Sequence, residues 1–93
     1  MQKTKVLIVD DEPAIREVLE RTLQEWGYDV RLASDGAEAR DLVESYDPEI
    51  VISDVVMPQL SGIDLLRCLK GGNPNRPVIL VTAYGPLAAA VAA

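Results

Sequence analysis

The segment Val6-Leu7-Ile8-Val9, followed directly by Asp10-Asp11-Glu12-Pro13, begins the pattern that runs through this chain. Its opening residues are all aliphatic, so the run is apolar on both faces, and it is too short for a helix. Such a run is typical of a central strand in a parallel sheet that is covered on both sides. Because Pro13 is well tolerated in the first turn of a helix, the acidic residues are predicted to lie between a strand and a helix.

The next stretch of sequence predicts a helix, a strand and a second helix. The first helix is expected to run from Pro13 to a stop at Gly27, because these residues recur at helical spacing: Ile15, Val18, Leu19, Thr22, Leu23 and Trp26. Trp26 and Tyr28 are expected to pack at the corner between this helix and a strand over residues 28–33. Asp35, with Glu38 three residues later, resembles a capping box that opens a helix to about Ser45.

The remaining sequence repeats the alternation of strand and helix. Ile50-Val51-Ile52 is again apolar throughout, and Val78-Ile79-Leu80-Val81 is a fourth apolar run. Between them, Ser61 is predicted to begin a helix that ends at Gly71-Gly72. Strands that alternate with helices indicate an α/β fold with a parallel sheet and right-handed crossovers. We therefore expect one domain over residues 1–93.

Composition excludes several classes of function. The formal net charge is −6, which argues against direct contact with nucleic acid, since that needs clustered Lys and Arg. The chain has no His and one Cys, Cys68, which excludes His-dependent catalysis in the chain and an internal disulfide. No apolar run reaches membrane-spanning length and the N-terminus does not read as a signal peptide. A cytoplasmic domain without membrane contact is the expectation.

Acidic residues follow two of the predicted strands. Asp10 and Asp11 come after the first strand and Asp54 after the third. In an open parallel sheet, ligands bind outside the carboxyl ends of the strands where the strand order reverses. With the strand order 2-1-3-4, Asp10, Asp11 and Asp54 converge there, and Thr82 brings a hydroxyl to the same rim.

Converging carboxylates favour a bound cation. Without a cation they repel one another and raise one another's pKa values. Hard oxygen ligands favour Mg²⁺ or Mn²⁺ over zinc, and Mg²⁺ typically uses one or two carboxylates. One aspartate then remains to act as a nucleophile toward phosphorus. A plainer alternative is that Asp11 or Glu12 only caps the following helix.

In their order and spacing, three segments resemble the receiver domains of bacterial response regulators: Val9-Asp10-Asp11-Glu12-Pro13, Ser53-Asp54-Val55-Val56-Met57-Pro58 with Gly62, and Val81-Thr82-Ala83. The resemblance covers residues 3 to about 85. It implies a flavodoxin-like, doubly wound parallel sheet of order 2-1-3-4. It also implies a sensor histidine kinase as partner and an output domain in the full-length protein, with transcription regulation as the output.

The resemblance also implies a role for each residue of the site. Asp54 would be the phosphoacceptor, and Asp11 would bind the metal directly. Asp10 would act mainly through a metal-bound water, and the backbone carbonyl of Val56 would be a further metal ligand. Thr82 would donate a hydrogen bond to the phosphoryl group and act in the switch. Arg16, beyond the acidic pair, either contacts an incoming kinase domain or lies on a solvated helix face.

The chain departs from the family pattern at its C-terminal end. The family's fifth strand and last helix are expected to be missing, and its lysine after the fifth strand has no counterpart. The closing residues 86–93 read as a truncated helix or as side chains recorded as alanine. Residues 78–81 would then lie at an exposed sheet edge, which favours a homodimer or a strand-swapped dimer.

Two other functions compete with a phosphorylated switch. The first is a metal-dependent phosphotransferase or hydrolase with an aspartate nucleophile. Such enzymes usually carry acidic residues two apart after the first strand, whereas Asp10 and Asp11 are adjacent. The second is a receiver-like interaction module that no longer takes phosphate, which the missing lysine favours. The intact set of Asp10, Asp11, Asp54 and Thr82 favours the switch, a domain that would catalyse only its own phosphoryl transfer and dephosphorylation.

Overall fold

The computed structural model describes residues 3–54, 62–70, 73–81 and 89–92. Its elements are β1 (Lys5–Val9), α1 (Pro13–Glu25), β2 (Asp29–Ala33), α2 (Gly36–Tyr46), β3 (Ile50–Asp54), α3 (Gly62–Lys70), β4 (Val78–Val81) and β5 (Ala89–Ala92). Every predicted strand and helix up to β4 is present, with boundaries within a few residues of those expected. Among the described helices, none is long and apolar enough to cross a membrane.

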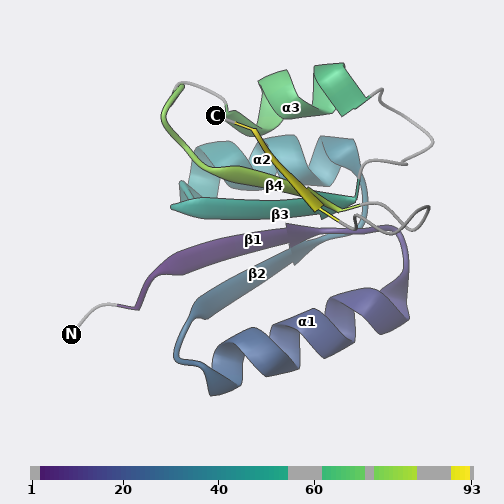
Figure 1. Cartoon of the computed structure of the whole chain (residues 1–93), viewed down its shortest axis with the longest axis vertical. Helices are drawn as coiled ribbons and strands as arrows, with labels where there is room; N and C mark the ends of the chain where they lie inside the picture. The colour runs from purple at the N-terminus through teal and green to yellow at the C-terminus, as the bar shows by residue number, and fades with distance from the viewer. Residues whose placement is uncertain (1–2, 55–61, 71–72, 82–88, 93) are drawn as a thin grey trace.

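The sheet has the order β2-β1-β3-β4-β5. β1, β2, β3 and β4 pair in parallel, which confirms the predicted doubly wound α/β fold and the order 2-1-3-4. Figure 1 shows α1 on one face of the sheet and both α2 and α3 on the other. The strand order reverses between β1 and β3. The chain adds β2 on one side of β1 and then returns to add β3 on the other side.

The closing residues correct one expectation. Residues 89–92 form β5, which pairs antiparallel with β4 from Val81↔Ala89 to Val78↔Ala92. The prediction that β4 lies at an exposed edge is therefore wrong. A strand ladder uses only backbone groups, so alanine-rich sequence satisfies the edge of β4 without a second molecule. This pairing removes the reason given for a strand-swapped dimer. Residues 89–92 are a strand, so the reading of the closing residues as a truncated helix is also wrong for this segment.

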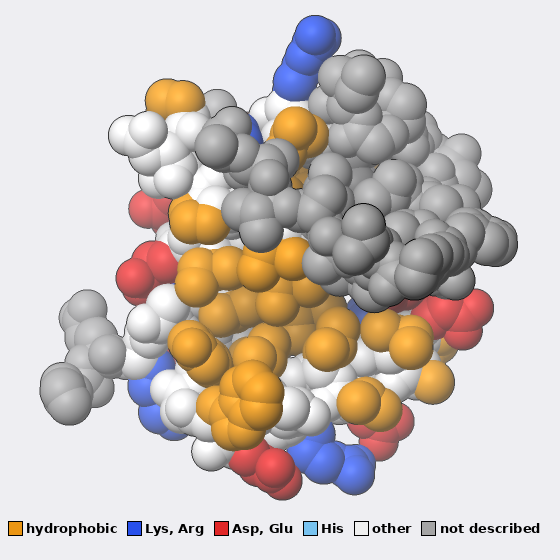
Figure 2. Space-filling model, viewed as in Figure 1, with side chains coloured by type: hydrophobic (Ala, Val, Ile, Leu, Met, Phe, Trp, Pro, Cys, Tyr) orange, Lys and Arg blue, Asp and Glu red, His pale blue; other side chains and the backbone are white. Residues whose placement is uncertain are grey.

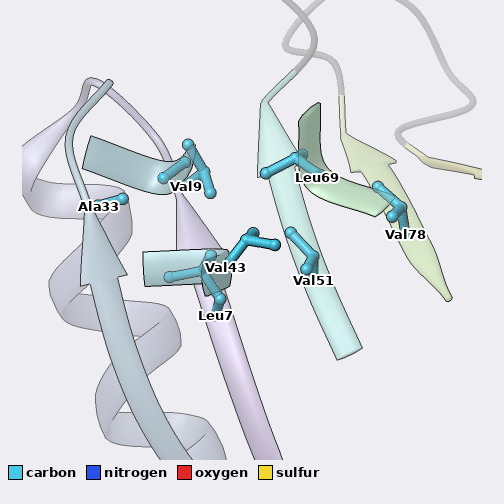
Figure 3. Packing of buried hydrophobic residues seen from close by; sticks show 8 residues of the cluster. Leu7, Val9, Ala33, Val43, Val51, Leu69 and Val78 are labelled. Carbon is cyan, nitrogen blue, oxygen red and sulfur yellow. The ribbon is translucent and has the colours of Figure 1, made fainter. Parts of the chain in front are cut away.

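The two faces of β1 supply two separate cores. Leu7 and Val9 point toward α2 and α3, where they join the cluster drawn in Figure 3, whose other members are Ala33, Ala39, Val43, Val51, Leu69 and Val78. Val6 and Ile8 point to the opposite face and pack with Val30 beneath α1. Alternate residues of a strand point to opposite faces, so a continuous apolar run fills both layers.

The first helix covers only part of its face of the sheet. Leu19 and Leu23 pack on the core, but Ile15 and Val18 are exposed and Trp26 is 71% exposed. The expectation that Trp26 is a packing residue is therefore wrong. Figure 2 shows apolar side chains gathered on this side of the molecule. A shallow apolar groove there is lined by Val6, Leu23, Trp26, Tyr28, Ile50, Ile52 and Ile79.

The ends of α1 and α2 follow the predicted signals. Gly27 has φ of +94°, and the N–H groups of Gly27 and Tyr28 donate to the carbonyls of Gln24 and Leu23, which is the Schellman ending of a helix. The Asp35 carboxylate accepts from the Glu38 N–H at 2.8 Å. The Glu38 carboxylate accepts in turn from the Ser34 N–H at 2.9 Å. The predicted cap is thus confirmed, with its return bond one residue earlier than in the standard box.

A buried arginine joins the segments before β3 and β4. Arg76 is only 3% exposed. Its Nε donates to the Pro48 carbonyl at 2.9 Å, and its Nη1 donates to the carbonyls of Leu69 and Lys70 at 3.0 and 3.1 Å. Its Nη2 also pairs with the exposed carboxylate of Asp47. One guanidinium therefore satisfies the end of α3 and fixes the entry to β3.

Replacing this arginine should destabilise the fold. In Arg76→Met the side chain stays long and apolar, but the buried carbonyls lose their donor. We expect a loss of at least about 2 kcal/mol in unfolding free energy, since each unsatisfied buried acceptor costs about 1–3 kcal/mol. Urea denaturation measures the change. Arg67→Met, an exposed position on α3, is the control and should be nearly neutral. Equal stability of the two variants would contradict this role for Arg76.

Tyr46 closes the amino-terminal end of the β1–β2 pair. Its hydroxyl donates to the Asp29 carbonyl at 3.0 Å and to the Asp29 carboxylate at 2.8 Å. Lys5 Nζ and Arg31 Cζ lie 5.5 and 5.0 Å from the ring centroid. Burial and the hydrogen bond to Asp29, whose negative charge also opposes ionisation, raise the pKa of Tyr46 to about 12. The fold therefore favours the neutral hydroxyl over the phenolate.

This pKa predicts a loss of stability at alkaline pH. The pKa of an unperturbed tyrosine is 10.0, so the contribution is complete below that pH and is lost as the pH rises through about 12. A spectrophotometric titration of the three tyrosines should show one that ionises late. Tyr46→Phe should remove the late step, and Tyr28→Phe should leave it in place. If the unmodified chain titrates in a single step near pH 10.0, the hydrogen bond does not hold the proton.

Candidate functional site

The carboxyl ends of β1 and β3 lie side by side. Val9 pairs with Ser53, so Asp10 and Asp54 occupy the next positions along two neighbouring parallel strands. Adjacent strands are about 4.8 Å apart. Asp54 pairs in turn with Val81 at the end of β4. The convergence of the three strand ends, predicted from topology, is therefore present in the backbone.

The predicted site residues divide into two groups. Asp10 and Asp11 lie within the described residues. Asp54 is the last residue of β3, and its backbone is described. The side chain of Asp54 and the residues Val56 and Thr82 lie outside the described residues. Their predicted roles therefore stay predictions.

Asp10 is buried, and its backbone groups and its carboxylate all take part in hydrogen bonds. It is 8% exposed, and its N–H donates to the Ala33 carbonyl at 3.1 Å, which continues the pairing with β2. Its carboxylate Oδ1 accepts from the Glu12 N–H at 2.9 Å. Its carbonyl accepts from Nη1 of Arg16 at 2.7 Å. The Asp10 carboxylate is thus engaged in its own turn.

Asp11 differs from Asp10 in its surroundings. Its side chain is exposed, and no hydrogen bond or ion pair joins it to another described residue. Glu12 is the N-cap residue of α1, yet its side chain makes no capping bond. Neither Asp11 nor Glu12 therefore makes the capping hydrogen bond of the plainer alternative, and the Asp10 carboxylate accepts from the Glu12 N–H, which precedes the helix. The Asp11 carboxylate therefore remains available for a ligand.

The donors at this edge fit a hard divalent cation. The side chains of Asp10 and Asp11 offer carboxylate oxygens, and the β3 end adds Asp54 to the same edge. Within the described side chains, no group of three or more His, Cys, Asp and Glu could hold a metal ion. A site with few protein ligands is compatible with Mg²⁺, which typically uses one or two carboxylates and keeps its remaining positions for water or phosphate.

Arg16 is the residue whose place the sequence did not settle. Rather than lying on a solvated helix face, it is half-buried and bonds the Asp10 carbonyl. The signal was its spacing, since one turn into α1 a long side chain can reach back to the end of β1. The contact with a kinase domain stays a prediction.

A second hollow lies at the other end of the sheet, between α2 and α3. It is lined by Arg40, Val43, Glu44, Asp47, Cys68, Asn73 and Arg76. Cys68 is partly buried and lines this hollow. The hollow adjoins the residues that precede β3 and β4, so it is separate from the acidic edge.

Comparisons with known proteins agree with the fold described above. The model of the response regulator receiver domain family matches residues 6–93. Response regulator MprA of Mycobacterium tuberculosis is 41% identical over 88 residues, which are 95% of this chain and 38% of that protein. The chain therefore spans well under half the length of this relative.

Solved structures agree with the family match. Chemotaxis response regulator CheY4 of Vibrio cholerae superposes with a TM-score of 0.83 at 32% identity, over 91% of this chain and 72% of that one. The receiver domain of the Francisella response regulator 1452 gives a TM-score of 0.79 at 35% identity, over 91% and 70%. The acidic edge, the sheet order and these likenesses agree. This chain belongs to the response regulator receiver domain family of two-component systems.

Proposed function

We propose that Asp54 accepts a phosphoryl group from a partner histidine kinase, in a reaction that depends on Mg²⁺. The observation that carries this proposal is the register of β1 and β3, which brings Asp10 and Asp54 to adjacent strand ends. Asp11 adds an exposed carboxylate beside them. Membership of the receiver family supports the same reading.

The chemistry follows from the donors at this edge. A carboxylate oxygen of Asp54 attacks phosphorus, its new P–O bond forms an acyl phosphate, and the P–N bond to the kinase histidine breaks. The departing imidazole keeps the bonding electron pair and takes up a proton from water. Asp11 and the Val56 carbonyl would hold Mg²⁺, and Asp10 would act through a bound water. When bound, Mg²⁺ offsets the negative charge of the phosphoryl oxygens.

Thr82 completes the proposed site from the end of β4. Its hydroxyl would donate a hydrogen bond to a phosphoryl oxygen and move toward it on activation. Attack of water on the acyl phosphate later returns Asp54 to its free carboxylate and releases phosphate. The domain would thus process only its own phosphoryl group and serve as a switch rather than as an enzyme for other substrates.

The switch would act within a longer protein. The related MprA is more than twice the length of the matched segment, so an output region is proposed beyond the receiver. We propose transcription regulation in the cytoplasm as the output. The net charge of −6 is unfavourable for binding nucleic acid, so the receiver itself would leave DNA contact to that region.

The first test is acceptance of phosphate. Incubation of the chain with Mg²⁺ and acetyl phosphate should add one phosphoryl group, detected by intact-protein mass spectrometry. The addition should disappear in Asp54→Ala and when a chelator removes Mg²⁺. Asp41→Ala, which removes an exposed aspartate of α2, is the matched control and should be modified normally. Modification that persists in Asp54→Ala would sink the assignment, and turnover of many equivalents of acetyl phosphate would favour an enzyme.

The second test separates the two neighbouring aspartates. Asp11→Asn removes a charge from a proposed direct ligand, so Mg²⁺ affinity should fall by more than about tenfold, the lower end of what outer ligand partners cost. Asp10→Asn should have the smaller effect, because its amide oxygen still accepts from the Glu12 N–H. Calorimetric titration with Mg²⁺ gives both affinities. A larger loss in Asp10→Asn would reverse the assigned roles.

A further inference from the structure

Arg16 makes a contact that joins the first helix to the acidic turn. Its backbone N–H donates to the Glu12 carbonyl at 3.1 Å, as the helix requires. Its side chain continues past this bond, and Nη1 donates to the Asp10 carbonyl at 2.7 Å. A bond from a charged donor at this distance is among the stronger kinds. Arg16 therefore spans the whole turn that contains Asp11.

With this contact the turn between β1 and α1 is fixed at both ends. The N–H of Asp10 is bound to Ala33 on β2, and its carboxylate is bound to the Glu12 N–H. The Asp10 carbonyl is the remaining backbone group of that residue, and Arg16 occupies it. The direction in which the chain leaves Asp10 sets where Asp11 begins. Loss of the arginine would free the carbonyl to rotate and Asp11 with it.

The positive charge of Arg16 acts on Mg²⁺ binding in the opposite direction to its hydrogen bond. A guanidinium stays protonated at every relevant pH. Within the described part of the chain Arg16 forms no ion pair, so its positive charge is not cancelled by a partner carboxylate there. A fixed positive charge close to a cation site repels the cation. Charge alone would therefore make Arg16 unfavourable for Mg²⁺, whereas its hydrogen bond would make it favourable.

We propose that Arg16 is a positioning residue of the phosphoacceptor site, which holds the acidic turn so that Asp11 is preorganised for the metal. This inference rests on the proposed function, because it takes the acidic edge as a Mg²⁺ site. The direction in which Arg16 changes Mg²⁺ affinity distinguishes this role from two simpler alternatives, an action through charge alone and no action at all. A residue that acts by charge alone would weaken Mg²⁺ binding, and a merely solvated one would leave it unchanged.

The experiment is a calorimetric Mg²⁺ titration of the unmodified chain and three variants. Arg16→Ala should lower Mg²⁺ affinity about tenfold, as loss of an outer-shell partner does, although it removes a repelling charge. Arg16→Lys keeps a charged donor of nearly the same reach and should recover part of that loss. Arg21→Ala is the matched control. It removes an arginine from the same helix that only pairs with Glu17 on the surface, so it should leave the affinity unchanged.

A second readout does not depend on the metal. In Arg16→Ala the Glu12 amide should exchange its hydrogen faster, because the Asp10 carboxylate that accepts from it is less fixed. Amides of β2 and α2 should exchange as before. Faster exchange confined to the turn, together with weaker Mg²⁺ binding, supports the proposal. Mg²⁺ binding that is unchanged or tighter in Arg16→Ala overturns it.

The outcome is separable from that of the proposed function. If Mg²⁺ binds and Arg16→Ala weakens it while acetyl phosphate fails to modify Asp54, the positioning role stands and the phosphoacceptor role falls. If Asp54 is modified and Arg16→Ala leaves Mg²⁺ affinity unchanged, the phosphoacceptor role stands and the positioning role falls. Absence of Mg²⁺ binding by the unmodified chain overturns both.

Discussion

The parallel pairing of β1 with β3 is the contact on which the rest of this structure depends. Val6 to Val9 pair with Ile50 to Ser53, and this places β1 inside the sheet, between β3 and β2. A strand with neighbours on both sides and layers on both faces must be apolar throughout, and this one is. The same register brings Asp10 level with Asp54. Core packing and the geometry of the acidic edge therefore share one cause.

The two ends of the sheet are organised by different forces. At the carboxyl end, acidic residues gather where the strand ends meet, and carboxylates brought together in this way repel one another. At the amino end, charges are paired within the chain. Arg76 satisfies the carbonyls before β3 and at the end of α3, and Tyr46 binds Asp29 between two cations. The amino end thus joins the strands through paired charges, while at the other end the Asp11 carboxylate is exposed.

Much of this arrangement could be predicted from the sequence. Apolar runs predicted the strands β1, β3 and β4, and Gly27 and Asp35 predicted helix ends that the structure confirms. The meeting of Asp10 and Asp54 followed from sheet order alone. Each of these features follows from a local sequence pattern or from the order of the strands, so it can be predicted from a single sequence.

Other features could not be predicted, for physical reasons. Helical spacing identified apolar residues on α1, but it did not tell which of two adjacent stripes faces the sheet, so Trp26 was misplaced. Arg76 has a side chain that usually stays in water, and only the assembled carbonyls around it make burial favourable. β5 depends on an open edge elsewhere in the chain, which residues 89–92 themselves do not encode. Each of these depends on contacts between distant segments.

The division of labour between Asp10 and Asp11 shows how the fold resolves two demands on adjacent carboxylates. In the turn after β1, the N–H of Glu12 precedes the helix and finds its acceptor in the Asp10 carboxylate. Asp10 takes this role and is buried, whereas Asp11 is exposed and without a structural task among the described residues. If the two aspartates were two positions apart, one residue between them would separate the aspartate that holds the turn from the aspartate that is exposed. Under the proposed role of Arg16, the hydrogen bonds on Asp10 would also set the direction in which the chain continues to Asp11.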